Sequence, residues 1–145
     1  AVTVTVCGPA VRVTADVSQS TTTFADVTGM TIAVTSGQTY VFSCELTYTT
    51  AINTTALQVS VNGPAMTTID FSVATATTAT AWHQAAQTAL DANTNPATGA
   101  AAVRLPVRVS GSFTPSAGGT LALRYRSEVA ASAVTIKRGS FCTVQ

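Results

Sequence analysis

The residues of this chain that could do acid–base or nucleophilic chemistry are few and stand apart. The chain has one histidine, His83, which follows Trp82. A hydrolytic triad needs a nucleophile, a base and a third group that orients the base. No Gly-x-Ser-x-Gly turn supplies the nucleophile, and no third partner for the histidine can be assigned. We therefore expect no catalytic residue, no cofactor and no enzymatic activity, with His83 as an exposed or packed strand residue.

Asp91, Asn93 and Asn95 have the spacing that opens a calcium-binding loop. Pro96 stands where such a loop requires glycine, and no glutamate follows at its twelfth position. Segments rich in Asp and Asn are commonly turns, because their side chains cap their own backbone. The sequence favours an exposed loop over residues 88–101 without a metal, and a calcium loop is the alternative.

Four arginines in the second half of the chain form a candidate contact surface: Arg104, Arg108, Arg124 and Arg126. The last two share one face of an expected strand and are expected to reach across to the first two on the preceding strand. Such a group is typical of a solvated or interface face that pairs with carboxylates such as Glu45 or Glu128. Binding of an anion or a glycan is the alternative.

The three cysteines, Cys7, Cys44 and Cys142, are odd in number and widely spaced. They lack the close pairs of a zinc or redox site. The favoured interpretation is free thiols used as small apolar side chains, which suits assembly in a reducing cytoplasm. A bridge between Cys7 and Cys142, joining the first and last strands, is the alternative.

The low charge of the chain limits the partners that it could bind. Charged residues make up 9% of its 145 residues, against about 25% in ordinary soluble domains. The net charge is +1 and no basic cluster is present, so we expect no nucleic-acid binding. Polar residues interrupt every apolar run before the roughly 20 residues that would cross a bilayer, so we expect no membrane insertion. A chain with so few charges either associates or risks aggregation.

Alternation of apolar and polar residues predicts an all-β fold of short strands. Gly37 is expected to join the segments 30–34 and 40–48 as a hairpin, and Pro106 to mark an edge strand or a bulge. The segment 76–102 would also suit a short helix, but a strand over 80–87 followed by an exposed loop over 91–99 is favoured. The strands are expected at 2–6, 11–17, 30–34, 40–48, 57–61, 69–73, 80–87, 103–113, 121–125 and 134–144.

One domain is expected over residues 1–145, with an N-terminal strand or arm over 1–10. The sequence begins at Ala1 without a methionine. Removal of an initiator methionine or excision from a longer chain would both give this start.

Four segments carry a resemblance to a module of tailed-phage and prophage virion structural proteins. They are Thr14–Val17, Phe24–Phe42, the turn Val-Asn-Gly-Pro-Ala over 61–65, and the ending that runs from Ala117 to Phe141. The resemblance covers most of the chain from about Val11, and the segment 70–106 matches loosely. It implies a structural protein of a phage particle.

A second resemblance is to the jelly roll of the C1q and tumour-necrosis-factor superfamily. Phe24, Gly29, Gly37, Tyr40 and Phe42 carry it, together with a late Gly–Leu-x-Leu run and a terminal Ser-Phe. This resemblance implies an antiparallel two-sheet β-sandwich that assembles as a homotrimer. Such a trimer would cover strand faces that bear little charge.

The resemblances imply a non-enzymatic protein on the virion surface, assembled in the cytoplasm of the host bacterium. A capsid decoration or cement protein is favoured, with itself and other phage capsid or tail proteins as partners. The alternative is a tail-fibre, spike or head-fibre domain that binds a host receptor or surface glycan. In that case Trp82, His83 and the loop 91–99 are the expected contact surface.

Overall fold

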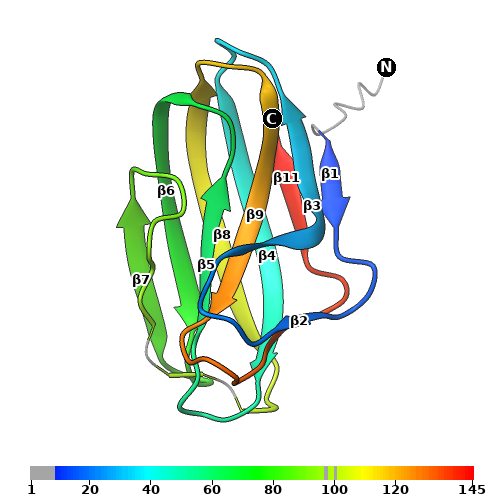
Figure 1. Ribbon diagram of the computed structural model, residues 1–145, viewed down its shortest axis with the longest axis vertical. Helices are drawn as coiled ribbons and strands as arrows, with labels where there is room; N and C mark the ends of the chain where they lie inside the picture. The colour runs from blue at the N-terminus through cyan, green and yellow to red at the C-terminus, as the bar shows by residue number, and fades with distance from the viewer. Residues whose placement is uncertain (1–8, 97, 100) are drawn as a thin grey trace, which may run out of the picture.

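The computed structural model describes residues 9–96, 98–99 and 101–145, and all regular structure in these residues is β-strand. The strands form two antiparallel sheets that lie face to face (Figure 1). The strands are β1 Ala10–Arg12, β2 Val17–Gln19, β3 Ala25–Val34, β4 Tyr40–Thr50, β5 Leu57–Asn62, β6 Met66–Ala76, β7 Trp82–Gln87, β8 Leu105–Pro115, β9 Gly119–Ser127, β10 Val134–Ile136 and β11 Phe141–Val144.

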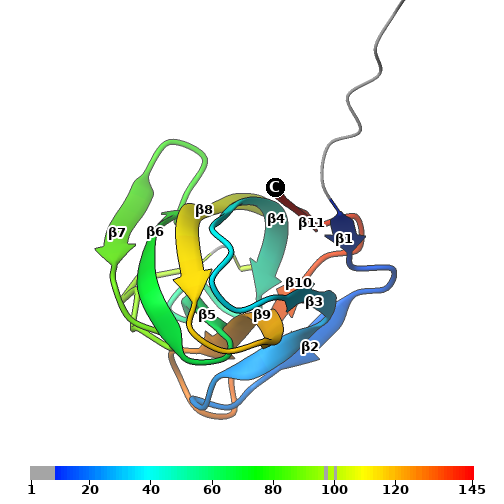
Figure 2. The same cartoon turned by 90° about the horizontal axis from the view of Figure 1, so that it is seen from above.

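The larger sheet has eight strands and contains the order β1-β11-β4-β8-β6-β7, with β10 pairing both β4 and β2. The smaller sheet has three strands in the order β3-β9-β5. Seen from above, the two sheets curl around a common interior, and β7 lies at the outer edge of the larger sheet (Figure 2). The predicted all-β, antiparallel two-sheet sandwich is confirmed, and its strands wrap the core in the manner of a jelly roll.

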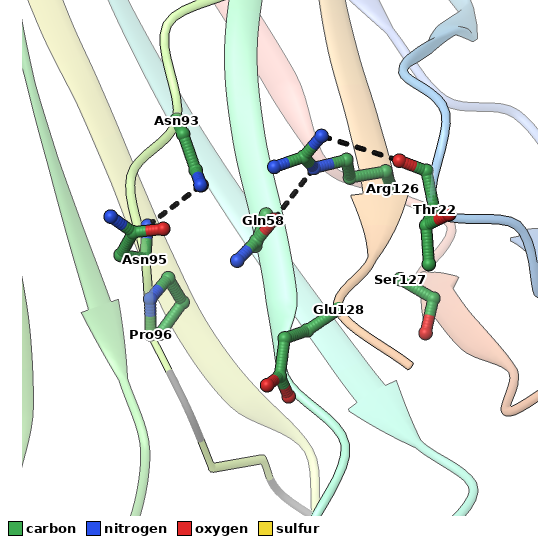
Figure 3. A pocket seen from close by; sticks show the side chains of 8 residues that line it. All are labelled: Thr22, Gln58, Asn93, Asn95, Pro96, Arg126, Ser127 and Glu128. Atoms are coloured by element: carbon green, nitrogen blue, oxygen red, sulfur yellow. Dashed lines mark hydrogen bonds between the residues drawn. The ribbon is translucent and has the colours of Figure 1, made fainter. Parts of the chain in front are cut away.

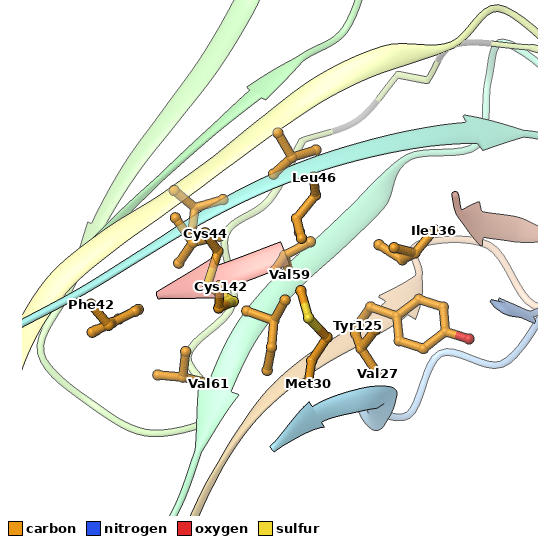
Figure 4. Packing of buried hydrophobic residues seen from close by; sticks show 14 of the residues in the cluster. Val27, Met30, Phe42, Cys44, Leu46, Val59, Val61, Tyr125, Ile136 and Cys142 are labelled. Carbon is orange, nitrogen blue, oxygen red and sulfur yellow. A yellow bond between two sulfur atoms is a disulfide. The ribbon is translucent and has the colours of Figure 1, made fainter. Parts of the chain in front are cut away.

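One apolar layer fills the space between the sheets. On β4 the buried side chains alternate with partly exposed ones, as the sequence pattern predicts. Val59, Val61 and Tyr125 of the smaller sheet belong to the same cluster as the buried residues of β4 (Figure 4). Full burial of one such side chain stabilises the fold by roughly 1.5–3 kcal/mol. The buried residues of β4 are Phe42, Cys44, Leu46 and Tyr48.

Tyr48 places a hydroxyl group inside this layer. The hydroxyl donates a hydrogen bond of 2.6 Å to the carbonyl of Ala76, at the end of β6. Burial raises the pKa of Tyr48 to about 12, because the phenolate would lose its hydration. The tyrosine therefore stays neutral at ordinary pH and ties the ends of β4 and β6 together.

The segments 30–34 and 40–48 do not form the expected hairpin. β3 pairs with β9 in the smaller sheet, whereas β4 pairs with β8, β10 and β11 in the larger sheet. The turn at Gly37 therefore carries the chain from one sheet to the other. Each strand has one apolar face, and this crossing lets both faces enter the same interior from opposite sides. Alternation identifies the buried face of a strand but not its partner, so the strands were predicted and their pairing was not.

Pro106 lies in a central strand, so the expectation of an edge strand or a bulge is wrong. Thr47 lies opposite it on β4 and directs its backbone N–H to Ser140 and its carbonyl to Lys137, away from β8. The two residues are therefore a non-hydrogen-bonded pair, and the proline nitrogen faces the β6 side. Pairing of β8 with β6 stops at Val107, so the ladder does not need an N–H at this position.

Two other expected strands are interrupted. The segment 134–144 forms β10 and β11, separated by a turn in which Gly139 has a φ of +92°. The segment 11–17 ends as β1 at Arg12, and β2 begins at Val17 after a bend. The strand expected over 80–87 is confirmed as β7. The expected strand at 2–6 and most of the N-terminal arm lie outside the described residues.

Cys44 and Cys142 form a disulfide, which corrects the expectation of free thiols. They lie directly opposite each other on β4 and β11, with Cα atoms 4.0 Å apart (Figure 4). The alternative bridge between Cys7 and Cys142 is also wrong, because Cys142 is already paired; Cys7 itself lies outside the described residues. A reducing compartment is no longer indicated, because that expectation depended on free thiols.

β3 bends at a shift of register with β9, between Asp26 and Thr31. Gly29 lies in this shift with a φ of +86°, a conformation that L side chains rarely adopt. A Cβ atom at this position would lie 2.8 Å from the carbonyl oxygen of Arg12. The bend in β3, visible in Figure 1, thus needs glycine both for the backbone angle and for the close approach of the neighbouring chain.

Replacing the disulfide by the double substitution Cys44→Ala and Cys142→Ala should lower the free energy of unfolding by about 3–5 kcal/mol, because the cross-link restricts the unfolded chain. Urea unfolding, followed by circular dichroism, measures the change. Addition of a reductant should lower the wild-type midpoint to a similar extent and leave the double variant unaffected. A wild-type midpoint that does not respond after reduction in the unfolded state would contradict this role of the disulfide.

The substitution Gly29→Ala should lower the free energy of unfolding by about 2 kcal/mol or more, since it combines an unfavourable φ with a steric clash. Gly37→Ala is the matched control, because Gly37 also has a positive φ, of +76°, but a Cβ atom added there would meet no other atom within 4 Å. The control should lose only about 1 kcal/mol. Equal losses in urea unfolding would show that the contact with Arg12 is unimportant.

Candidate functional site

Five of the nine candidate contact residues come together at the outer face of the smaller sheet. Arg124 and Arg126 project from β9, and Asp91, Asn93 and Asn95 lie in the connection between β7 and β8. A pair of hydrogen bonds joins Arg124 to Asp91. Asn93, Asn95 and Arg126 line one hollow. The structure therefore brings together the second pair of arginines and the Asp/Asn segment.

The other four candidates, Arg104, Arg108, Trp82 and His83, belong to or adjoin the larger sheet. The expected contact between the two pairs of arginines is wrong, because β8 and β9 follow each other in sequence but lie in opposite sheets. Arg108 pairs with Glu45 at 3.2 Å, which confirms one expected carboxylate partner. Its guanidinium carbon lies 5.9 Å from the Trp82 ring centre. These side chains are exposed, so the ion pair contributes at most about 1 kcal/mol.

The connection between β7 and β8 is only in part the exposed loop expected over 88–101: Asn93 and Asn95 are exposed, whereas Thr94 and Pro96 are buried. The N–H of Asp91 donates to the carbonyl of Val61 at 2.8 Å, and the hydroxyl of Thr94 donates to the carbonyl of Val59 at 3.1 Å. Thr94 is only 1% exposed. β5 is the last strand of the smaller sheet, so this segment covers a sheet edge that would otherwise present free carbonyl groups.

Residues 91–96, here called the covering segment, are held on the smaller sheet by Arg124. Its Nε donates to Oδ1 of Asp26 on β3 at 2.8 Å. Its Nη1 donates to both carboxylate oxygens of Asp91, at 3.0 and 2.9 Å. The amide of Asn62 on β5 also donates to Asp91. The hydrogen bond with Asp26 and then that with Asp91 raise the pKa of Arg124 by favouring its charged form.

The same contacts argue against the calcium alternative. Arg124 binds both carboxylate oxygens of Asp91, and Oδ1 of Asn93 accepts the N–H of Asn95 at 3.1 Å in a local turn. Within residues 9–96, 98–99 and 101–145, no group of three or more His, Cys, Asp or Glu side chains could hold a metal ion. The same ranges contain no helix of the length and apolarity needed to span a membrane.

A polar hollow of about 540 Å³ opens between β5, β9 and the covering segment (Figure 3). Arg126 of β9 and Gln58 of β5 are paired residues of the smaller sheet and form its floor. Every other lining residue is polar except for one proline. The residues that line the hollow are Thr22, Gln58, Asn93, Asn95, Pro96, Arg126, Ser127 and Glu128.

Arg126 is held in a defined position on the floor of the hollow. Its Nε donates to Oε1 of Gln58 at 2.6 Å, and its Nη1 donates to the carbonyl of Thr22 at 3.2 Å. The guanidinium carbon also lies 4.4 Å from the ring centre of Phe24, within the range of a cation–π contact. Three independent contacts therefore orient the guanidinium group before any ligand arrives.

The sequence did not indicate Gln58, Thr22 or Pro96 as site residues. Gln58 lies at an outward position of β5, where a polar residue in an alternating strand is ordinary. Its importance depends on being opposite Arg126 in the β5–β9 register. That register joins segments 68 residues apart, and no local pattern encodes it.

The substitution Asp91→Asn should release the covering segment from Arg124 and speed hydrogen exchange of the residue 91 amide, whose N–H donates to the carbonyl of Val61. Asparagine is nearly isosteric and tolerates the positive φ of 52° at this position, so the change removes mainly the charge. We expect a loss of about 1 kcal/mol in the free energy of unfolding. Asp26→Asn is the matched control, since it removes the other carboxylate on Arg124.

The control should leave exchange in the covering segment unchanged. Equal acceleration in the two variants would show that Arg124 does not hold the segment specifically through Asp91.

Comparison with known proteins supplies no relative from which a site could be transferred. No family model matches the chain, and no curated protein or solved structure matches it either. The candidate site therefore depends on the geometry of the hollow and of the Arg124 network alone.

Proposed function

We propose that this chain is a non-enzymatic structural protein on the exterior of a tailed-phage particle, where it assembles as a homotrimer and decorates the capsid. The observation that carries the proposal is the outer face of the larger sheet. On β4 and β8 this face bears mostly hydroxyl-bearing and small side chains, and the charges of Arg108 and Glu45 are paired with each other. A phage particle is proposed because the segments quoted above resemble phage structural proteins.

Exposed apolar side chains on the larger sheet suit contact between copies. Val41 on β4, Phe141 on β11 and Trp82 on β7 are 57%, 42% and 42% exposed. Burying them between subunits is favourable by about 25 cal/mol per Å² of apolar surface. Because the face has little net charge, identical copies can pack side by side without strong repulsion. A closed trimer on a symmetric shell would multiply such weak contacts.

A tail-fibre, spike or head-fibre domain that binds a host receptor or glycan is the second candidate function. The polar hollow on the smaller sheet favours it, because Arg126, Glu128 and several amide side chains converge there. The hollow and the outer face of the larger sheet lie on opposite sides of the sandwich. Self-association and ligand binding could therefore coexist in one protein.

The substitution Val41→Glu should convert the trimer to monomers, because it places a charge in the proposed contact face. Val103→Glu is the matched control: this valine is equally exposed, at 59% against 57%, but lies in the loop before β8. Light scattering on a sizing column measures the mass. We expect the wild type and the control to have three times the mass of one chain.

A wild-type protein that is monomeric at high concentration would contradict the trimer. Fractionation of a lysate that contains the assembled particle then separates the two functions. A decoration protein should sediment with heads, and Val41→Glu should release it, whereas sedimentation with isolated tails would favour the fibre function.

A further inference from the structure

We propose that the polar hollow on the smaller sheet binds an acidic saccharide, a sugar ring that carries a carboxylate group. Arg126 receives the carboxylate, while Glu128 and the amide side chains receive the ring hydroxyls. The inference rests on the second candidate function above, receptor or glycan binding. It does not depend on where the chain lies in a particle or on whether it forms a trimer.

Arg126 retains hydrogen-bond donors for a ligand. A guanidinium has five N–H donors, and contacts with Gln58 and Thr22 use one from Nε and one from Nη1. Over the described part of the chain, Arg108 and Arg124 have carboxylate partners within 4.0 Å and Arg126 has none. An oriented guanidinium without an acidic partner suits a carboxylate from outside, which it can bind through two parallel hydrogen bonds.

Gln58 adds a second donor beside the guanidinium. Its Oε1 accepts the hydrogen bond from Arg126, so the amide nitrogen must lie on the other side of the group. Figure 3 shows this nitrogen pointing away from Arg126 and into the hollow. The residue is only 4% exposed, and its place on β5 fixes the donor in position. A ligand that displaces water from this amide without accepting its hydrogen bond would lose affinity, because the donor would then be left unpaired.

The rim of the hollow supplies acceptors. Glu128 is exposed directly after β9, and Asn95 is exposed on the opposite side in the covering segment. A sugar hydroxyl donates one hydrogen bond and accepts others, so it can bridge a carboxylate and an amide. The Arg124–Asp91 network holds the segment that carries Asn95, which keeps the two sides of the hollow at a fixed separation.

The charges and the shape of the lining select the ligand class. Arg126 and Glu128 are the ionised residues of the lining, and their charges cancel. A phosphate dianion would therefore meet one cation and one carboxylate, whereas a singly charged, polyhydroxylated ring can satisfy both groups. Among the described residues that line the hollow, none has an aromatic side chain on which a neutral sugar could stack. The hollow, at about 540 Å³, lies within the range of small-ligand sites, roughly 300–1,000 Å³.

Isothermal titration of the wild-type protein with digalacturonate tests the proposal, with the neutral digalactose of the same linkage and inorganic phosphate as comparison ligands. We expect digalacturonate to bind with a Kd below about 1 mM and both comparison ligands to bind at least about tenfold more weakly. Arg126→Gln should weaken binding at least about tenfold, since it removes the charge but keeps an amide. Arg108→Gln, on the opposite sheet, is the matched control and should change the Kd less than about twofold.

Asn95→Gly provides a second test if Arg126→Gln does not fold, because glycine accepts the positive φ of 40° and only the rim amide is lost. It should weaken binding about threefold. Absence of binding up to about 10 mM digalacturonate would overturn the proposal. Equal binding of digalactose or of phosphate, or equal effects of Arg126→Gln and Arg108→Gln, would overturn it as well. A protein that binds the acidic sugar but never sediments with particles would instead count against the structural function.

Discussion

Apolar side chains from both sheets meet in a single layer, and the rest of the molecule is arranged around that layer. Each strand contributes one face to the interior, so consecutive strands such as β3 and β4, or β8 and β9, pass to opposite sheets and enclose the same side chains. The disulfide between Cys44 and Cys142 lies within the layer and joins β4 to β11. Loss of this packing would expose the apolar faces of both sheets to water, which is unfavourable.

The outward faces of the two sheets do not contribute to the apolar layer, and their side chains differ in chemistry. The larger sheet presents hydroxyl groups, small side chains and a few exposed apolar residues such as Val41. The smaller sheet presents Arg124 and Arg126, each held by several hydrogen bonds. A weakly charged face suits contact with identical neighbours, and a face with oriented donors suits a small polar ligand. The surface proposed for contact between copies and the surface proposed for ligand binding therefore lie on opposite sides of the sandwich.

The segment after β7 links stability to the proposed binding site. Its backbone and Thr94 bond to carbonyl groups of β5 and so cover the edge of the smaller sheet. Its Asp91 is fixed by Arg124, and its Asn93 and Asn95 form one side of the hollow. One ordered connection therefore closes a sheet edge and shapes a polar concavity, and a change in its anchoring would alter both.

Alternation of apolar and polar residues was enough to predict most strands and their inward faces, since this pattern is local and a strand has a period of two residues. The sequence thus predicted the strands that correspond to β4 and β7, and the Asp/Asn-rich connection that follows β7. The pairing of the strands became known from the folded molecule, and with it the contacts of Cys44 with Cys142, of Arg124 with Asp91 and of Gln58 with Arg126. These contacts join residues between 33 and 98 positions apart. Their formation depends on how all the strands share one interior, which no short stretch of sequence specifies.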